Sequence, residues 1–435
     1  MKPPRIAEWV RSLRLRLVRP LRIRMAGLTR ARARGRFVAV TGSSAKSTTT
    51  MLIAAILDDE GNVLNQVFEN TINPLIRTIR RSRIADFVVV ETGVGGKGQM
   101  STMAGLLKPD VSVVTMVGLE HYSAFRSRDA IATEKGALVA ATAPDGLAVL
   151  NADDPLTMGM AERTPARIVT FGHGSQADCR ILRVTGDAQE GVTVHLAWRG
   201  QEIAVKTQFA GAHFAIPVAA AAVTGLELGV PPERIRTAIA GCAPPFLRLS
   251  RHHIAGGPVF LADCAKAPQG TLHLAFDALG RTPAPRRRIV LGTISDYRGN
   301  RRRAYRNAIE QALLVADEVI LLSESGYGFD YLRDRSAERR VKVFAEIRDA
   351  SIYIAGTAVK DEVILLKGSQ SNHLERILLA QTEGVNCWER ACGKGIGCVE
   401  CGLFGHDFAR HRATGRRSRL RRLTGRAMRG GRGVA

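Results

Sequence analysis

A short apolar strand that runs through a small polar turn into a helix constrains this chain more than any other feature. Residues 37–40 (Phe-Val-Ala-Val) predict a buried parallel strand. The turn T-G-S-S-A-K-S-T follows, and residues 51–57, with Gly61 just beyond, predict a helix closed by a C′ glycine. A strand, a glycine turn, a Lys-Ser pair and a helix N-terminus together form a cradle for phosphate.

The cradle predicts a nucleotide-binding loop made of Gly42, Ser43, Ser44, Ala45, Lys46, Ser47 and Thr48. Backbone N–H groups would face the anion, Lys46 would reach the outer phosphates, and the Ser47 hydroxyl would hold Mg²⁺. The loop is shorter than the usual eight-residue pattern, and Ala45 stands where glycine is common, a modest change if its backbone is not left-handed. A chance turn that caps an ordinary helix is the alternative.

Three further predicted strands end in polar side chains. Glu91 closes the strand over residues 86–90, His121 follows the strand over residues 111–115, and Asn151 follows the strand over residues 147–150. Ligands of open α/β sheets bind beyond the carboxyl ends of the strands. We therefore expect Glu91 and His121 to converge near Ser47, although loop residues with local hydrogen bonds would give the same pattern.

Length and composition indicate a globular protein of two or three domains. The chain has 435 residues, 45% of them hydrophobic. No apolar run approaches the roughly 18 residues of a membrane span, and the N-terminus has no apolar segment typical of a secretion signal. Seven cysteines, most of them clustered, fit a reducing cytoplasm better than a disulfide framework.

The positive charge is concentrated at the two ends of the chain. Residues 1–36 hold twelve basic residues and one acidic residue, and residues 381–435 hold twelve basic and four acidic ones. Such ends suggest contact with an anionic surface, either the inner face of a membrane or nucleic acid. Trp9, Leu13 and Leu17 share one helical face, which fits an interfacial amphipathic helix. A disordered arm or a helix packed on the body fits equally well.

Several stretches taken together resemble the Mur ligases, the ATP-dependent amide ligases of peptidoglycan synthesis. These stretches are TGSSAKSTTT, VVVETG, LAVLNADDP, LADCAKAPQGTL and VILLKGSQSNHLE, and the resemblance extends over residues 37–380. It is nearest to the branch that adds D-alanyl-D-alanine. The resemblance implies an α/β fold with a mostly parallel central P-loop ATPase domain over residues 37–245 and a second, Rossmann-like α/β domain over residues 246–380. Short antiparallel strands are expected between residues 176 and 206.

The resemblance also implies metal ligands. Ser47 and Glu91 match the ligands of a first Mg²⁺ beside the ATP phosphates, and His121 matches a ligand of a second Mg²⁺. Lys135 matches the lysine that is carbamylated in this family. Carbamylation turns a cation into an anion, which suits a hard divalent ion. Without it, Lys135 would be a surface lysine or a salt-bridge partner.

Other residues are assigned to the nucleotide and to catalysis by the same resemblance. Arg248 matches an arginine on the transferring γ-phosphate, and Asp263 matches an aspartate near the ribose. The asparagines of the family's adenine-contacting element are replaced between residues 211 and 217, so adenine would be held differently, for example by stacking on Phe214. The implied catalytic set is Lys46, Lys135, Arg248 and His121.

The implied function is a cytoplasmic ATP-dependent carboxylate–amine ligase with an acyl-phosphate intermediate. Phosphoryl transfer needs cations that neutralise spreading charge, which Lys46, Arg248 and two Mg²⁺ ions would supply. About 36 residues precede the first strand, so we expect no domain for a UDP sugar there, and a lipid-linked, polymeric or small acid is an alternative donor. The alternative function is a binding protein on a degenerate scaffold of this type, acting at membrane or nucleic acid.

The tail is unlike this family. Residues 381–409 contain four cysteines spaced C-x4-C-x5-C-x2-C, namely Cys387, Cys392, Cys398 and Cys401. Four thiolates within so short a segment suit a structural Zn²⁺. An Fe–S cluster and metal-free thiols are the alternatives. Residues 410–435 hold ten basic residues and no acidic one, and are expected to be disordered.

Overall fold

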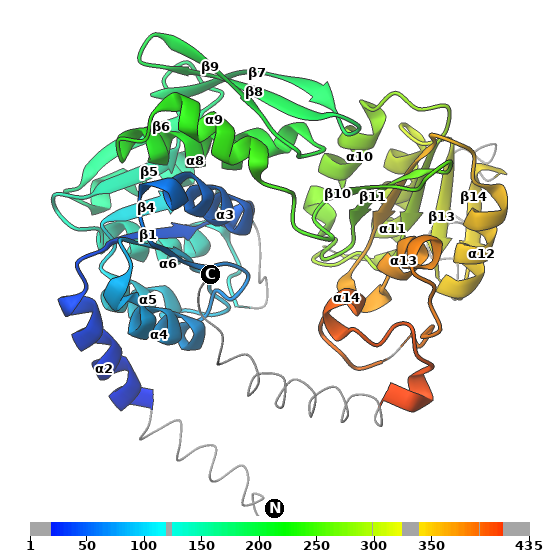
Figure 1. Ribbon diagram of the computed structural model, residues 1–435, viewed down its shortest axis with the longest axis horizontal. Coiled ribbons are helices and arrows are strands. Elements are labelled where there is room, and N and C mark those ends of the chain that lie inside the picture. The colour runs from blue at the N-terminus through cyan, green and yellow to red at the C-terminus, as the bar shows by residue number, and fades with distance from the viewer. Residues whose placement is uncertain (1–18, 119–123, 298, 324–338, 391, 412–435) are drawn as a thin grey trace, which may run out of the picture. The chain divides into compact units, whose positions relative to one another are not determined.

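The computed structural model describes residues 19–118, 124–297, 299–323, 339–390 and 392–411 (Figure 1). The chain divides into two compact units. The first unit holds the described residues up to 186 together with 191–208 and 212–243. The second holds residues 187–190, 209–211 and the described residues from 244 onward.

A nine-stranded sheet forms the first unit, in the order β2-β3-β1-β4-β5-β6-β7-β8-β9. Its strands are β1 (Arg36–Thr41), β2 (Val63–Gln66), β3 (Phe87–Glu91), β4 (Val111–Val114), β5 (Leu147–Asn151), β6 (Arg167–Gly172), β7 (Cys179–Asp187), β8 (Gly191–Trp198) and β9 (Gln201–Lys206). Neighbours from β2 to β6 are parallel, and β8 and β9 are antiparallel. Because β1 lies between β3 and β4, its carboxyl end is a topological switch point, where ligands bind in open α/β sheets.

The helices of the first unit are α2 (Arg19–Arg32), α3 (Lys46–Leu57), α4 (Ile72–Arg81), α5 (Gln99–Leu107), α6 (Arg128–Ala140), α7 (Pro155–Met158), α8 (Ala215–Glu227) and α9 (Pro232–Gly241). Single 3₁₀ turns follow at Asp58–Glu60, Ser82–Ile84, Ala161–Arg163 and Ala212–Phe214. The apolar strand residues are buried against helices, which is why β1 and β3 are continuous hydrophobic runs. The side chains of Phe37 and Val88, for example, are fully buried in one core cluster.

Helix α2 shows which alternative applies to the last part of the basic N-terminal segment. It packs against α4 and α5, with Ala26 buried. The Arg30 guanidinium donates to the carbonyl of Leu107 (2.6 Å), pairs with Asp110 (3.1 Å) and lies over the Phe37 ring. Residues 19–32 therefore form a helix packed on the body, whereas Trp9, Leu13 and Leu17 lie outside the described residues.

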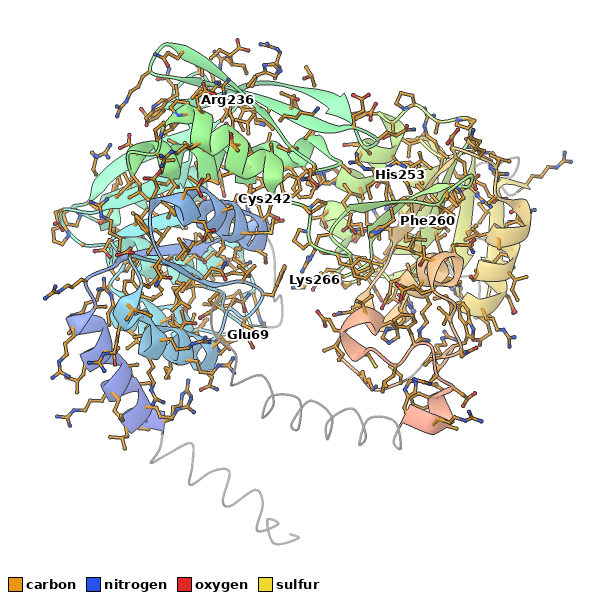
Figure 2. The ribbon with its side chains drawn as sticks, in the orientation of Figure 1. Glu69, Arg236, Cys242, His253, Phe260 and Lys266 are labelled. Atoms are coloured by element: carbon orange, nitrogen blue, oxygen red, sulfur yellow. The ribbon has the colours of Figure 1, made fainter. Side chains whose placement is uncertain are left out.

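The second unit contains a six-stranded sheet in the order β10-β11-β15-β12-β13-β14, parallel except for the β10–β11 pair. Its strands are β10 (Ser250–His253), β11 (Val259–Asp263), β12 (Arg287–Leu291), β13 (Glu318–Leu322), β14 (Val341–Phe344) and β15 (Val363–Lys367). Its helices are α10 (Leu272–Gly280), α11 (Arg301–Leu313), α12 (Ile347–Thr357), α13 (Glu375–Thr382) and α14 (Cys398–Cys401), with 3₁₀ turns at Gln269–Thr271, Gln370–Asn372 and Phe408–Arg410. Phe260 of β11, labelled in Figure 2, lies in its core.

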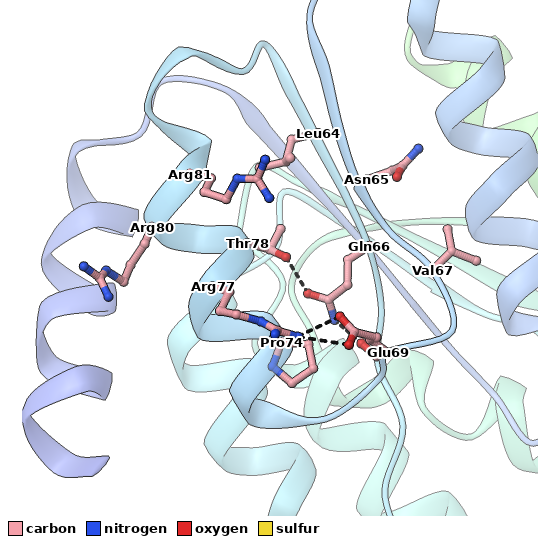
Figure 3. A pocket seen from close by; sticks show the side chains of 10 residues that line it. All are labelled: Leu64, Asn65, Gln66, Val67, Glu69, Pro74, Arg77, Thr78, Arg80 and Arg81. Carbon is pink, nitrogen blue, oxygen red and sulfur yellow. Dashed lines mark hydrogen bonds and ion pairs between the residues drawn. The ribbon is translucent and has the colours of Figure 1, made fainter. Parts of the chain in front are cut away.

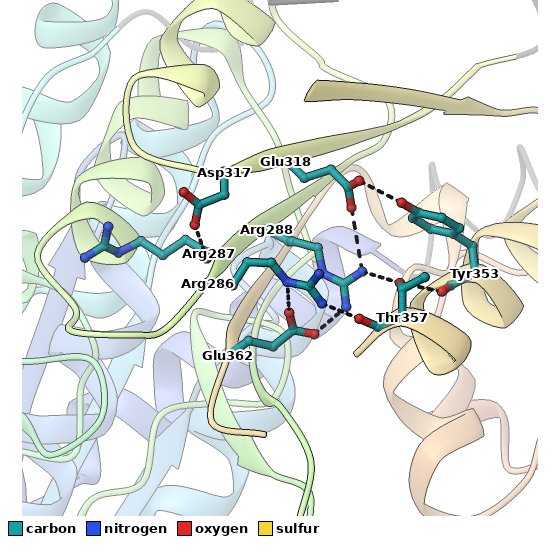
Figure 4. Close-up of polar contacts among 8 residues, drawn as sticks. All are labelled: Arg286, Arg287, Arg288, Asp317, Glu318, Tyr353, Thr357 and Glu362. Atoms are coloured by element: carbon teal, nitrogen blue, oxygen red, sulfur yellow. Dashed lines mark hydrogen bonds and ion pairs between the residues drawn. The ribbon is translucent and has the colours of Figure 1, made fainter. Parts of the chain in front are cut away.

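A buried ion-pair network closes the amino-terminal edge of this second sheet (Figure 4). The Arg288 side chain is fully buried, binds the buried carboxylate of Glu362 and donates to Thr357 Oγ1 (2.9 Å). Glu318 accepts a hydrogen bond from the Tyr353 hydroxyl (2.7 Å) and lies 3.7 Å from Arg288. Such a network is strongly destabilised when one partner is removed, because the other charge stays buried.

The expected α/β fold class is confirmed by the two mostly parallel sheets. The strands expected between residues 176 and 206 are present, with β8 and β9 antiparallel, and they continue the main sheet beyond β6. The expected C′ role of Gly61 is wrong: α3 ends at Leu57, a 3₁₀ turn follows, and Gly61 is extended. In the described part of the chain, no helix is both long and apolar enough to cross a membrane.

Candidate active site

The phosphate loop begins where β1 ends, and Gly42 is required there. Its φ is 145°, and a Cβ atom at this position would come within 1.9 Å of the Thr115 hydroxyl. The next residue, Ser43, donates from its backbone N–H to the Met116 carbonyl (2.8 Å) and from its hydroxyl to Gly118 (3.0 Å). The loop is thus fastened to the segment after β4, and α3 starts directly behind it at Lys46.

Ala45 adopts the left-handed conformation, so the condition under which its replacement of glycine would be a modest change is not met. Its φ is 65°, a region that costs an L-residue with a side chain about 1–2 kcal/mol and costs glycine nothing comparable. The replacement of the usual glycine therefore stores strain in the loop. Two threonine hydroxyls stabilise the first turn of α3 by donating to carbonyls: Thr49 to Ala45 (3.0 Å) and Thr50 to Lys46 (2.9 Å).

Two lysine side chains meet at the loop. Lys46 Nζ donates to the Gly42 carbonyl at 2.6 Å, and Lys135 Nζ, which is fully buried on α6, donates to the same oxygen at 2.9 Å. Both bonds end on one oxygen, so the ammonium groups are no farther apart than the sum of the two distances. Two like charges at that separation repel by about 3 kcal/mol at an effective dielectric of about 20. An anion placed here would be stabilised by both.

Ser47 and Glu91 are brought together as predicted. The Ser47 hydroxyl donates to Glu91 Oε2 at 2.7 Å, and Glu91 is 3% exposed at the carboxyl end of β3. Two neighbouring ligands of an octahedral Mg²⁺, each about 2.1 Å from the ion, lie about 3 Å apart. The oxygen pair fits that requirement with little adjustment, and both are hard ligands of the kind Mg²⁺ prefers.

Sequence reasoning missed the residues that hold the Glu91 carboxylate. Phe68 donates from its backbone N–H to Glu91 Oε2 (3.0 Å), and the Asn70 amide donates to Oε1 (3.0 Å). Phe68 has a left-handed φ of 67°, which is a strained position of the kind that clusters at functional sites. The sequence signal for these residues is the polar segment that follows β2. The hydrophobic pattern did not reveal this short strand.

The segment from β4 toward His121 is anchored by buried polar groups. Asn151 donates to the Thr115 carbonyl (2.7 Å), and Asp154 accepts from the Val117 N–H (2.6 Å). Arg128 donates to the Val117 carbonyl (3.0 Å) and pairs with Asp154 (3.2 Å). His121 itself lies outside the described residues, so its assignment stays a prediction.

In the second unit, Asp263 and Lys367 are partners at the carboxyl ends of neighbouring strands. Lys367 Nζ is 2.6 Å from Asp263 Oδ2 and donates to the Lys266 carbonyl at 3.1 Å. Lys266 is exposed in the segment after β11 (Figure 2). The predicted ribose ligand is therefore already paired with the buried Lys367 side chain, which orients the Asp263 carboxylate.

Arg248 stands between two strained residues. Leu247 (φ 65°) and Leu249 (φ 53°) are both left-handed and both buried, while Arg248 is half-buried. Both leucines are buried, Leu247 in the same core cluster as Phe260, and strained positions of this kind cluster at functional sites. Nothing in the sequence indicated this strain.

Phe214 does not suit its assigned role in this structure. Its ring is only 6% exposed, at the N-cap of α8, and lies 4.4 Å from the His213 ring. A base would need an accessible ring face for stacking. This burial argues against stacking of adenine on the Phe214 ring. It favours a packing role for Phe214 at the start of α8.

A basic hollow lies beside the Glu91 segment, between β2 and α4 (Figure 3). Arg77, Arg80 and Arg81 line it, and Arg77 pairs with Glu69 at 2.8 Å. Gln66 joins the hollow to the candidate site: its side chain accepts from Thr78 (2.8 Å), and its amide reaches the Glu91 carbonyl (3.5 Å). Such a surface can receive an anionic group next to the metal-binding carboxylate.

The four cysteines of the tail line one cavity, but they are not gathered into a ready four-thiolate site. Among the described residues, the metal-binding groups that lie within 4.8 Å of one another belong to His373, Glu375 and Cys398. Arg376 Nε donates to Cys398 Sγ (3.2 Å). Burial, reinforced by the Glu375 charge, raises the pKa of the Cys398 thiol to about 12.

This chain is similar to known proteins. Residues 40–225 match the model of the Mur ligase middle domain. The chain is 32% identical over 221 residues to UDP-N-acetylmuramoyl-tripeptide–D-alanyl-D-alanine ligase of Mycobacterium tuberculosis, covering 50% of this chain and 42% of that protein. It is 23% identical over 350 residues to the ligase of that name from Bacillus subtilis, covering 79% and 75%. The chain thus spans less than half the length of the first of these relatives.

Solved structures agree with the fold. MurF from Acinetobacter baumannii superposes with a TM-score of 0.74 at 20% identity, covering 83% of this chain and 80% of that one. MurF ligase from Thermotoga maritima, solved in complex with ADP, gives a TM-score of 0.70 at 20% identity, covering 82% of both chains. At this identity the likeness establishes the fold.

Proposed function

Residues 40–225 of this chain match the model of the Mur ligase middle domain, and we propose that the protein is an ATP-dependent ligase that joins a carboxylate to an amine. The observation that carries the proposal is the Ser47–Glu91 pair beside the phosphate loop. It brings two hard oxygen ligands for Mg²⁺ next to a phosphate-binding loop. Phosphorylation of a carboxylate by ATP requires both. The products would be an amide, ADP and phosphate.

The residues of the loop bind and orient the nucleotide in this proposal. Backbone N–H groups at the start of α3 and the Lys46 ammonium bind the phosphates. Phe68 and Asn70 hold the Glu91 carboxylate in place, so that Ser47 and Glu91 form one side of a magnesium site. Bound Mg²⁺ would neutralise the charge that spreads over the phosphoryl oxygens.

We assign the remaining roles by resemblance. Lys135 lies at the phosphate loop, where its carbamate would replace one of two adjacent positive charges by a negative one and provide a ligand for a second Mg²⁺, with His121 as its partner ligand. Arg248 would contact the transferring phosphoryl group, and Asp263 the ribose. The Lys367 ion pair fixes the orientation of the Asp263 carboxylate.

The substrates are proposed from the names of the relatives. D-alanyl-D-alanine is the first amine to test, and a UDP-N-acetylmuramoyl-tripeptide the first acid. The basic hollow of Figure 3 offers Arg80 and Arg81 for an anionic part of the acid. Lipid-linked and polymeric acids also contain a carboxylate that ATP could phosphorylate, and they are the alternative donors.

The test measures ADP release by the purified full chain with ATP, Mg²⁺ and D-alanyl-D-alanine, and with each class of acid in turn. We expect ADP to form only when acid and amine are both present, with an amide product of the corresponding mass. Tight nucleotide binding without ADP formation from any acid would instead favour a degenerate, nucleotide-regulated binding protein.

Two finer assignments belong to the same proposal. We infer a structural zinc in the cysteine-lined cavity, as the cysteine spacing predicts. We also infer a cytoplasmic protein that contacts anionic membrane, because α2 exposes Leu21, Met25 and Leu28 along one helical face among its arginines. Cosedimentation with anionic vesicles should fall when these three side chains become Ser, and unchanged sedimentation would remove the membrane contact.

A further inference from the structure

Three side chains of different metal-binding types converge in the second unit. The imidazole of His373, a carboxylate oxygen of Glu375 and the sulfur of Cys398 lie within 4.8 Å of one another. All three side chains are buried, with 2%, 0% and 4% of their surface exposed. Two of them come from the segment that leads into α13, and Cys398 begins α14 in the cysteine-rich tail.

The separations within this cluster fit the coordination sphere of one zinc ion. His373 Nδ1 lies 3.3 Å from Glu375 Oε1 and 3.4 Å from Cys398 Sγ. With the ordinary bond lengths of tetrahedral zinc, a nitrogen ligand lies about 3.4 Å from an oxygen ligand and about 3.6 Å from a sulfur ligand. Both separations from Nδ1 are therefore within about 0.2 Å of the values that a shared zinc ion requires.

Glu375 supplies an independent sign of a bound cation. Its Oε1 accepts a hydrogen bond from the Cys398 backbone N–H (2.9 Å), but its Oε2 is buried and has no hydrogen-bond partner among the described residues. A buried carboxylate oxygen without a partner loses its hydration and gains no protein contact in exchange. A cation would compensate for that loss, because the carboxylate can bind it through either oxygen or through both.

His373 is oriented to bind through Nδ1. Its Nε2 lies 3.1 Å from Cys392 Sγ, and we assign the proton to Nε2, with the sulfur as acceptor. The outer hydrogen bond of a ligating imidazole selects the tautomer in this way and leaves the other nitrogen with a lone pair. That lone pair and the Glu375 carboxylate are both acceptors, so a cation between them removes their repulsion. The competing arrangement is a metal-free imidazolium that pairs with Glu375.

The sulfur of Cys398 has a charged donor that suits a thiolate ligand. Arg376 Nε donates to Sγ at 3.2 Å, and the buried guanidinium is anchored through Nη1 to the Glu389 carbonyl (2.7 Å). Burial raises the pKa of the metal-free thiol to about 12. A divalent ion displaces the proton of a cysteine ligand, and the guanidinium then stabilises the thiolate as an outer contact of the site.

We propose that His373 Nδ1, the Glu375 carboxylate and Cys398 Sγ bind one zinc ion. Imidazole, carboxylate and thiolate all bind zinc, and the thiolate favours zinc over the harder Mg²⁺. His373 and Cys398 also line the cavity of the tail cysteines, from which a fourth ligand can reach the ion. The inference rests on the structural zinc proposed above and replaces the four-thiolate set that the spacing predicted. It does not depend on the ligase activity.

Zinc at this cluster would fasten the tail to the second sheet. His373 follows the turn Gln370–Asn372 with a left-handed φ of 52°. The Asn372 side chain accepts from the Thr293 N–H (2.6 Å) and donates to the Thr293 hydroxyl (3.0 Å), just beyond β12. The ion would thus join Cys398 of the tail to the loops at the carboxyl ends of β12 and β15.

The experiment uses the full chain purified without added metal, and compares zinc content by mass spectrometry across matched variants. We expect about one zinc per chain in the wild type. Glu375→Gln and Cys398→Ser should lose most of it. The controls Glu400→Gln, at an exposed glutamate of α14, and Cys401→Ser should retain it. Loss of zinc from Cys401→Ser with retention in Glu375→Gln would overturn the proposal in favour of the thiolate set.

A second measurement protects the test against variants that do not fold. Cobalt(II) exchanged into the wild-type protein should show tetrahedral d–d bands with sulfur-to-cobalt charge transfer of one-thiolate intensity. Charge transfer of three-thiolate or four-thiolate intensity overturns the proposal. A wild-type protein that binds no zinc even when zinc is added overturns it as well and leaves a hydrogen-bonded His373–Glu375 pair. ADP release, measured on the same samples, reports separately on the ligase activity.

Discussion

The phosphate loop of the first unit and the cysteine cavity of the second are both candidate metal sites, but they are built differently. In the first, Ser47 and Glu91 are already hydrogen-bonded to each other, and Phe68 and Asn70 support the carboxylate. In the second, the proposed ligand Glu375 has an oxygen, Oε2, that is buried. The described ligands of the first site are thus hydrogen-bonded to protein groups, whereas the second site contains a buried oxygen without a hydrogen-bond partner among the described residues.

This difference distinguishes a catalytic metal site from a structural one. A site whose groups satisfy one another persists without its ion, so removing Mg²⁺ should leave the first unit folded. A buried polar atom without a partner costs about 1–3 kcal/mol, and a structural zinc returns that energy and more. The following substitutions test this contrast, beginning with the largest expected effect.

Glu91→Ala should lower Mg²⁺-dependent ADP formation about a thousandfold, because it removes a metal ligand from the site of charge development. The measurement is turnover under saturating ATP, with the melting temperature of each unit as control. Glu91→Gln keeps the hydrogen bond from Asn70 available and should lose activity with little change in stability. Turnover within a few-fold of wild type would remove Glu91 from the metal site.

Arg288→Leu should destabilise the second unit by about 3–5 kcal/mol, because Glu362 would be left buried without its ion-pair partner. Chemical unfolding that resolves the two units should show the loss in the second unit alone. The double variant Arg288→Leu/Glu362→Leu should recover part of the stability, since both charges are then absent. Equal loss in the single and double variants would contradict the argument.

Lys135→Ala should lower turnover about a hundredfold, and short carboxylates should restore part of it by supplying the anion that a carbamate provides. The matched control is Lys97→Ala, an exposed lysine of the same unit. Mass spectrometry under native conditions should find a carbamate mass on wild-type protein only. Full activity of Lys135→Ala would exclude a role for this lysine in the reaction.

The phosphate loop could be predicted from the sequence because the residues that form it are contiguous in the chain. The strand, the turn, Lys46 and Ser47 lie within about a dozen residues, and Glu91 is found by the rule that ligands gather at carboxyl strand ends. Phe68 and Asn70 were missed because β2 is a four-residue edge strand whose last two residues are polar. A strand that short does not produce a hydrophobic alternation.

The second unit was harder to predict because its partners are distant in the chain. Arg288 follows two other arginines and has the appearance of a solvated charge run, yet its partner Glu362 is 74 positions away. The cysteine spacing marked a metal-binding segment, but only the fold brings His373 beside Cys392 and leaves His411 Nδ1 bare. Spacing identifies candidate ligands, whereas burial and hydrogen bonding select among them.

The smallest expected effect concerns strain in the phosphate loop. Ala45→Gly should stabilise the first unit by about 0.5 kcal/mol, because glycine relieves a left-handed backbone that costs alanine about 1–2 kcal/mol while its unfolded state gains about 0.5–1 kcal/mol of entropy. The matched control is Ala55→Gly in α3, where the backbone is helical and the same substitution should destabilise by about 1 kcal/mol. Opposite signs for one chemical change, measured by the unfolding of the first unit, would locate the strain at residue 45. If both variants are destabilised alike, the backbone of residue 45 is not strained, and the phosphate loop forms without a conformational cost at this position. Stability of the second unit should be unchanged in both, since neither residue belongs to it.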